Sequence, residues 1–220
     1  MGARALNGKS LRSRTCSSIG VLEELDSNGV PGPPRILAIL SSALEKCIQK
    51  NEKGLKASSQ KEVITIFHGS RVPALSIRQY IDRIFKYSNC SPSCFVVAYI
   101  YLERFLHQMD IHLTSLNAHR LLITSFMLAC KFVEDECYNN AYYAKVGGIT
   151  TAEINRLEMK LLASIDFKLH VDEETFNTYC SQLEEEAMEK CRIERTFRIC
   201  GWGKSFTNKN GSNNTPTAAI

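Results

Sequence analysis

The stretch RLLITSFMLACKFVE, residues 120–134, decides the fold. In a helix built from it, apolar side chains predominate on every side from Leu121 to Val133. Such a helix must be buried by neighbours on several sides. The preceding stretch SCFVVAYIYLERFL, residues 93–106, has the same character. Two consecutive helices of this kind predict a central hairpin that other helices enclose.

Amphipathic helices are predicted on both sides of this hairpin, because apolar residues recur there at helical spacing. Their starts carry typical signals, such as Pro34, Ser76 and Thr150. The stretch VITIFHGSRVPAL is apolar but has no partner strand, so an irregular link is expected there. A polar loop is expected over residues 136–149. The sequence therefore predicts an all-α protein with helices near residues 35–51, 77–89, 93–109, 117–134, 152–165 and 172–191.

The chain of 220 residues divides into one helical unit with tails. Residues 1–32 are expected to be a disordered N-terminal tail, since they are polar and lack periodicity. Residues 33–59 are expected to form an N-terminal helix and a linker. The main helical unit is placed at residues 60–191. Residues 192–220 are expected to be a flexible tail, although they could instead add a helix or pack on the unit.

Composition limits the classes of partner. The chain is 44% hydrophobic and 23% charged, as in a globular protein with a core, and its net charge is +4. Much of the positive excess lies near the two ends, so no basic stripe for nucleic acid is expected. No run reaches the roughly 18 apolar residues of a membrane span. Residues 1–20 lack a secretory signal, and the nine cysteines are interpreted as reduced thiols of a cytoplasmic or nuclear protein.

The residues predict neither an enzyme nor a cofactor. No glycine-rich phosphate loop follows a strand, and the five histidines are scattered. Cys90 and Cys94 are separated by three residues, and Cys130 and Cys137 by six, so the chain lacks the Cys-x-x-Cys pairs of common zinc sites. The cysteines are interpreted as small apolar residues of the core, and no metal ligand is predicted.

Lys131 is the conspicuous charge, because its neighbours Cys130 and Phe132 are apolar. Its stem could pack while the ammonium reaches water. Alternatively, a carboxylate of the next helix could hold it at the rim of an interface, and Glu158 is the candidate. Arg78 and Glu103 raise the same question, since they could pair across a helix contact or lie on solvated faces.

Several segments together resemble the cyclin box, a unit of five helices. They are IRQYIDRIFKYSN, AYIYLERFL, RLLITSFMLACKFVED and NRLEMKLLASIDFKL, and the resemblance covers residues 60–191. YLERF is similar to the family's Tyr-Ile-Asp-Arg-Phe stretch, and ACKFVED to its Ser-Lys-Phe-Glu-Glu stretch. NNAYYAKVGGI is closer still to plant P-type cyclins, also called U-type, which are similar to the yeast cyclins of the phosphate-starvation pathway.

This resemblance implies a regulatory subunit that forms a heterodimer with a cyclin-dependent protein kinase and activates it, in cell division or phosphate signalling. Lys131 would donate to kinase backbone carbonyls, and Glu158 would hold Lys131 and accept from kinase N–H groups. Arg78 and Glu103 would form an internal ion pair. The other residues that the resemblance places on the kinase-binding face are Phe132, Glu134, Leu162, Phe167 and Leu169.

Two other functions stay open. An adaptor in transcription or signalling could reuse the same fold, since fold alone does not fix function. An adaptor would have no need of the pair formed by Lys131 and Glu158. A thiol-based enzyme would require a cysteine with a depressed pKa.

Overall fold

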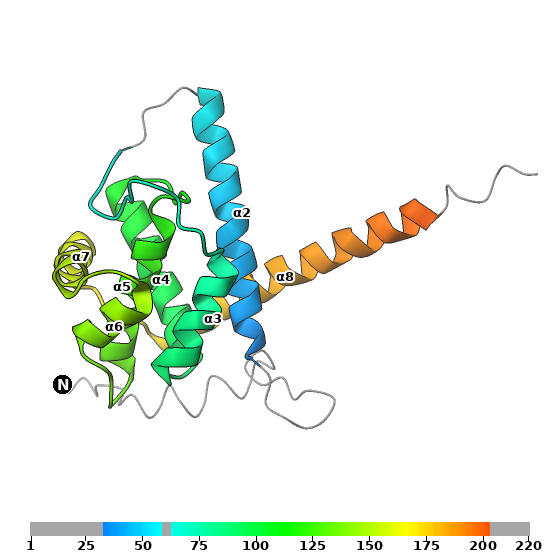
Figure 1. Cartoon of the computed structure of the whole chain (residues 1–220). Helices are drawn as coiled ribbons and strands as arrows, with labels where there is room; N and C mark the ends of the chain where they lie inside the picture. The colour runs from blue at the N-terminus through cyan, green and yellow to red at the C-terminus, as the bar shows by residue number, and fades with distance from the viewer. Residues whose placement is uncertain (1–32, 59–62, 203–220) are drawn as a thin grey trace, which may run out of the picture.

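The computed structural model describes residues 33–58 and 63–202, and in these ranges it contains helices and no strand (Figure 1). The predicted all-α class is confirmed. The predicted N-terminal tail lies outside the described residues, as does the chain from residue 203 onward. The helices in the described part are α2 (Arg35–Ser58), α3 (Ile77–Ser88), α4 (Ser93–Met109), α5 (Ala118–Val133), α6 (Asn140–Gly147), α7 (Thr151–Ser164) and α8 (Glu173–Trp202).

The predicted central hairpin is formed by α4 and α5, which pack against each other along their lengths. The other helices surround this hairpin: α2 packs against α3 and α8, and α6 contacts both α3 and α7 (Figure 1). Phe95 of α4 and Phe126 of α5 are fully buried, and their ring centroids lie 4.5 Å apart. The apolar surface of two such helices is too large to leave in water, which is why they form the centre of the bundle.

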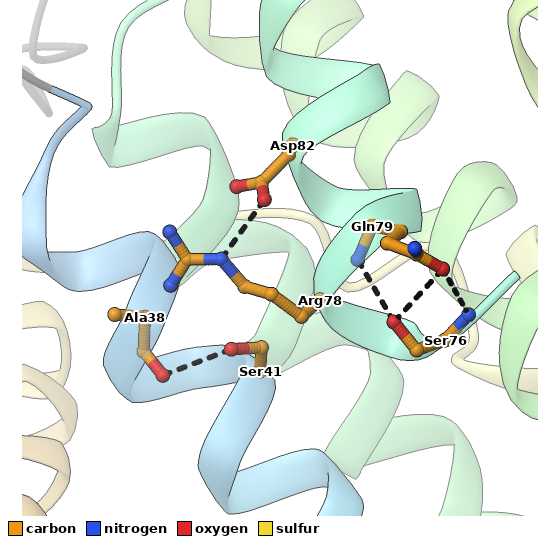
Figure 2. A network of polar contacts seen from close by, with 6 residues as sticks. All are labelled: Ala38, Ser41, Ser76, Arg78, Gln79 and Asp82. Carbon is orange, nitrogen blue, oxygen red and sulfur yellow. Dashed lines mark hydrogen bonds and ion pairs between the residues drawn. The ribbon is translucent and has the colours of Figure 1, made fainter.

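Side chains at the helix starts fix where α3 and α7 begin. The Ser76 hydroxyl accepts from the Gln79 amide, and the Gln79 side chain accepts from the Ser76 amide, a complete capping box (Figure 2). The Thr150 hydroxyl likewise accepts from the amide of Glu153. The Glu153 carboxylate, however, binds Arg120 of α5 at 2.6 Å. Glu153 thus lies in the capped first turn of α7 and also ties this helix to the central hairpin.

Residues 140–147 form α6, where the sequence analysis expected a polar loop. The Asn139 side chain caps the helix by accepting from the Tyr142 amide. Gly148 ends it in the left-handed conformation at φ 71°, which glycine adopts without strain. Tyr143 and Val146 are buried, so α6 is held by tertiary packing. A helix of eight residues is marginal by itself, and its short apolar stripe is easily overlooked in a polar segment.

The C-terminal helix is also longer than expected. The sequence pattern predicts an end at residue 191, whereas α8 continues to Trp202. Its first half packs against α2 and α4, and its second half extends away from the bundle (Figure 1). Residues 192–202 of the predicted tail are therefore helical in the structure.

A glycine controls how closely α6 approaches α5. A Cβ added at Gly147 would lie 2.8 Å from Cγ1 of Ile123 and 3.3 Å from the Tyr80 hydroxyl. We expect Gly147→Ala to lower the free energy of unfolding by about 1–3 kcal/mol, because the buried Ile123 must shift. Gly54→Ala is the matched control, since Gly54 lies in α2 with open space around it and should gain up to about 1 kcal/mol. Urea denaturation measures both variants. A Gly147→Ala variant as stable as the parent would contradict the close contact between α6 and α5.

Candidate functional site

Lys131 and Glu158 form an ion pair at the edge of the bundle. The ammonium Nζ lies 2.6 Å from Oε1 of Glu158, so the structure brings together the two residues that the sequence analysis associated. Lys131 is in the last turn of α5, and Glu158 is in the middle of α7. The Lys131 side chain is 31% exposed and that of Glu158 14%. The pair is therefore partly desolvated but open to a partner on one side.

Asn140 holds the second oxygen of the same carboxylate. Its amide nitrogen donates to Oε2 of Glu158 at 2.7 Å and lies equally close to Oδ1 of Asn155. Asn140 is the first residue of α6, so this helix positions the ion pair. Sequence reasoning missed Asn140 because it placed these residues in a loop. With both oxygens bound, the Glu158 carboxylate cannot rotate freely, and Lys131 is held in one place.

We expect Asn140→Ala to lower the free energy of unfolding by about 1.5–3 kcal/mol, because a hydrogen bond to a charged carboxylate is lost. Asn155→Ala is the control, since Asn155 contacts the Asn140 amide but not the carboxylate, and its loss should cost under about 1 kcal/mol. Chemical denaturation of both variants measures the difference. Equal losses would show that the contact with Glu158 carries no stability of its own.

Large apolar side chains are exposed next to this ion pair. Phe132 follows Lys131 and is 50% exposed, and Met159 follows Glu158 and is 61% exposed. Consecutive helical residues are rotated by about 100°, so each of these side chains flanks its charged neighbour. Leu162 lies one turn beyond Glu158 and is partly buried against the core. Met159 was not among the predicted residues, although its position beside Glu158 could have indicated it.

Phe167 follows α7 in an unusual backbone conformation. Asp166 and Phe167 have φ of 52° and 54°, a region that a bulky residue rarely adopts. The Phe167 amide donates to the carbonyl of Leu162 at 2.9 Å, which fixes this turn to the end of α7. The Phe167 ring is 62% exposed. Strain retained at an exposed aromatic residue is typical of functional surfaces.

The predicted residues Glu134 and Leu169 have internal partners. Oε1 of Glu134 accepts from the Ser91 amide at 2.9 Å, just before α4, and lies 3.4 Å from Sγ of Cys94. The carbonyl of Leu169 accepts from the buried Tyr101 hydroxyl at 2.6 Å, and the Leu169 side chain packs against the core. Both residues therefore support the segments on either side of the ion pair from within the fold.

The structure does not bring Arg78 and Glu103 together. Arg78 reaches along its own helix to Asp82, with Nε 3.0 Å from the carboxylate (Figure 2). Glu103 instead accepts from Tyr99 and Tyr179. Burial raises the pKa of the Tyr99 hydroxyl, and the hydrogen bond to Glu103 raises it further. The predicted internal ion pair is replaced because an acid four residues along a helix is the nearer partner for Arg78.

We define the Lys131 face as the surface formed by the ion pair and its apolar neighbours. It combines a fixed, partly exposed ammonium with the exposed rings of Phe132 and Phe167 and the exposed thioether of Met159. Such a surface can bind backbone carbonyls and apolar side chains of another protein. Its residues are Lys131, Phe132, Glu158, Met159, Leu162 and Phe167.

Comparison with known proteins agrees with this architecture. A family model described as Cyclin matches residues 35–169. The chain is 56% identical over 155 residues to Cyclin-P3-1 of Oryza sativa subsp. japonica, covering 70% of this chain and 66% of the rice protein. The chain belongs to the cyclin family. This cyclin is also 51% identical over 162 residues to Cyclin-U3-1 of Arabidopsis thaliana, covering 74% of this chain and 73% of that protein.

The resemblance to plant P-type and U-type cyclins is confirmed by these relatives. The matched range includes α2 and ends before α8. Cyclins are regulatory proteins rather than enzymes, and the family in general has kinase partners. None of the helices in the described part of this cyclin has the length and apolar composition needed to cross a membrane.

Proposed function

We propose that this cyclin binds a cyclin-dependent protein kinase through the Lys131 face and activates it. The observation that carries the proposal is the ion pair between Lys131 and Glu158, which is fixed on both carboxylate oxygens yet remains partly exposed. A charge ordered in this way, at the edge of the bundle and beside exposed apolar residues, is suited to a protein interface. Its contribution to stability is limited, because the Lys131 side chain is still 31% exposed and water screens the ion pair.

The chemistry of the ammonium indicates what it would bind. An ammonium has three N–H donors, and the contact with Glu158 occupies one of them. Backbone carbonyls at the end of a partner's helix or in a loop would accept the others. Because Glu158 and Asn140 already order the lysine, binding would lose little side-chain entropy at this residue.

Exposed apolar residues would supply most of the buried area at this interface. Phe132, Met159 and Phe167 are each at least half exposed, and aromatic residues and methionine are enriched in the centres of protein interfaces. We assign Glu134 and Leu169 a role different from direct contact with the kinase. Each has a partner within the fold, so they would support the segments that carry this face. A kinase is active when the ion pair between its Lys and its Glu is formed. Binding would activate the kinase if this face fits that conformation better than the inactive one.

The experiment is co-purification of the full chain with a panel of purified cyclin-dependent kinases, followed by phosphorylation of a histone peptide. We expect at least one kinase to be retained and its rate to rise. Retention of no kinase, or retention without a rise in rate, would contradict the proposal and favour an adaptor. The identity of the retained kinase would separate the two proposed outputs, cell division and phosphate signalling, and would indicate a nuclear or cytoplasmic site of action.

A further inference from the structure

Three cysteines form a cluster where the link between α3 and α4 meets the end of α5. The Sγ atoms of Cys90, Cys94 and Cys130 all lie within 4.8 Å of one another. Cys90 is in the link, Cys94 is in the first turn of α4, and Cys130 precedes Lys131 in the last turn of α5. Sequence spacing did not indicate this cluster, because the third sulfur comes from a different helix.

A carboxylate oxygen lies beside one of the three sulfurs, that of Cys94. Oε1 of Glu134 is 3.4 Å from Sγ of Cys94, and the Ser91 amide at 2.9 Å holds it there. Glu134 follows α5, so it comes from the same segment as Cys130. Three thiolates and one carboxylate form a donor set that Zn²⁺ accepts, because zinc binds both sulfur and oxygen in tetrahedral sites. A softer ion such as Cu(I) prefers sulfur alone, so the oxygen favours zinc.

The distances fit a tetrahedral ion after a small contraction. Zinc–sulfur bonds of about 2.3 Å place two sulfurs about 3.8 Å apart in a tetrahedral site. The three sulfurs lie within 4.8 Å of one another, so each pair must close by no more than about 1 Å to reach that separation.

The surroundings of the cluster suit an ion with several anionic ligands. The Ser88 hydroxyl lies 3.1 Å from Sγ of Cys90, and Tyr143 is hydrogen-bonded to Cys130. Such contacts orient metal ligands in known sites. The N-terminus of α4, which carries Cys94 in its first turn, adds a positive partial charge.

An ion would also have a path to the cluster. Cys94 and Cys130 are fully buried, whereas Cys90 is half-buried. Cys90 lines a shallow hollow that opens to solvent, together with Phe85, Lys86, Asn89 and Ser91.

We propose that Cys90, Cys94 and Cys130 bind one Zn²⁺ ion, and that the Glu134 carboxylate, which contacts Cys94, turns toward the other two sulfurs to become the fourth ligand. Each thiol releases its proton to solvent as its sulfur coordinates the metal, so about three protons leave per ion bound. The ion would join the start of α4 to the end of α5. The site is structural, and it fixes the turn that carries Lys131 and Phe132. It does not depend on whether a kinase binds the Lys131 face.

The test is a titration of the reduced full chain with Co²⁺, followed by Zn²⁺. We expect one equivalent of Co²⁺ to give the near-ultraviolet charge-transfer bands of cobalt thiolates and the intense visible bands of a tetrahedral ion, and Zn²⁺ to abolish both. Zinc binding should release about three protons in an unbuffered titration and should raise the melting temperature. Absence of thiolate charge transfer, or octahedral cobalt bands, would overturn the proposal.

Matched variants locate the ion. Cys90→Ser removes the half-exposed ligand, and we expect it to weaken Co²⁺ binding by about 100-fold or more, since even changes outside the ligand set cost 10- to 100-fold. Cys47→Ser is the control, because Cys47 is half-buried in α2 and bonded to Asn51, outside the cluster. It should bind Co²⁺ like the parent. Circular dichroism checks the fold of both.

A further variant tests the fourth ligand without removing a cysteine. Glu134→Gln should retain the charge-transfer bands, shift the visible bands, and weaken Co²⁺ binding by about 10-fold or more. The site would be overturned if Cys90→Ser bound Co²⁺ as tightly as the parent. It would also be overturned if Cys90→Ser and Cys47→Ser lost Co²⁺ affinity to the same extent, because the metal would then lie elsewhere. Unchanged visible bands and affinity in Glu134→Gln would overturn the role of Glu134.

Discussion

Lys131→Ala is expected to weaken kinase binding by about 30- to 5,000-fold, the range that corresponds to about 2–5 kcal/mol for one partner of a desolvated charge pair. The substitution removes the donors to the kinase and leaves the Glu158 carboxylate without its cation at the interface. Glu158→Ala should have an effect of similar size, because Lys131 would lose the contact that orders it. Calorimetric titration of the purified kinase measures both dissociation constants.

Lys160→Ala is the matched control for this prediction. Lys160 is exposed on α7, two residues beyond Glu158, and no ion pair involving it is found among the described residues. Lys160→Ala removes the same charge as Lys131→Ala. It should change the dissociation constant of the kinase by less than about threefold, as expected of a surface charge outside the Lys131 face. Circular dichroism must show both variants folded. A folded Lys131→Ala variant that binds the kinase as tightly as the parent would contradict the role of Lys131.

Phe126→Ala is expected to destabilise the protein by about 3–5 kcal/mol, the typical cost of truncating a fully buried aromatic side chain. Phe126 lies in the middle of α5, 0% exposed, and its ring centroid is 4.5 Å from that of Phe95 and 6.3 Å from that of Tyr143. Its removal opens a cavity between three helices at once. Urea denaturation, with the midpoint and slope both fitted, measures the loss.

Tyr87→Ala provides the comparison, because the Tyr87 ring is 48% exposed and only its backbone carbonyl accepts the hydrogen bond from Tyr142. That bond survives truncation, and we expect a change of under about 1 kcal/mol. If Phe126→Ala costs no more than Tyr87→Ala, then the hairpin of α4 and α5 is not the centre of the core.

The centre of the fold could be predicted from the sequence because helices buried on all sides consist mainly of apolar residues. The helices α4 and α5 are apolar on every side, and no arrangement other than a central one accommodates them. The helix α6 was missed because its eight residues bury only one narrow stripe. Its signals were nevertheless present, since Asn139 is a favoured N-cap residue and Gly148 a favoured helix end. The extension of α8 beyond residue 191 leaves no comparable mark, because polar and apolar residues alternate there irregularly.

The candidate site shows the same division between local and tertiary information. The association of Lys131 with Glu158 was predictable because each is a charge within an apolar helical stretch. The partner of Arg78 was not predicted correctly, because a local acid at Asp82 competes with any distant one. The cysteine cluster and the contact of Asn140 with Glu158 were beyond reach, since both depend on how the ends of separate helices meet.

Hydrogen exchange of the chain with and without its kinase tests most directly whether the Lys131 face binds that kinase. We predict that binding slows exchange of the backbone amides in the last turn of α5, in the second half of α7 and in the link that carries Phe167. Exchange in α2 and in the second half of α8 should stay unchanged. Slowed exchange confined to α2, α3 or α8, with the end of α5 unaffected, would contradict the account and place the kinase on another surface.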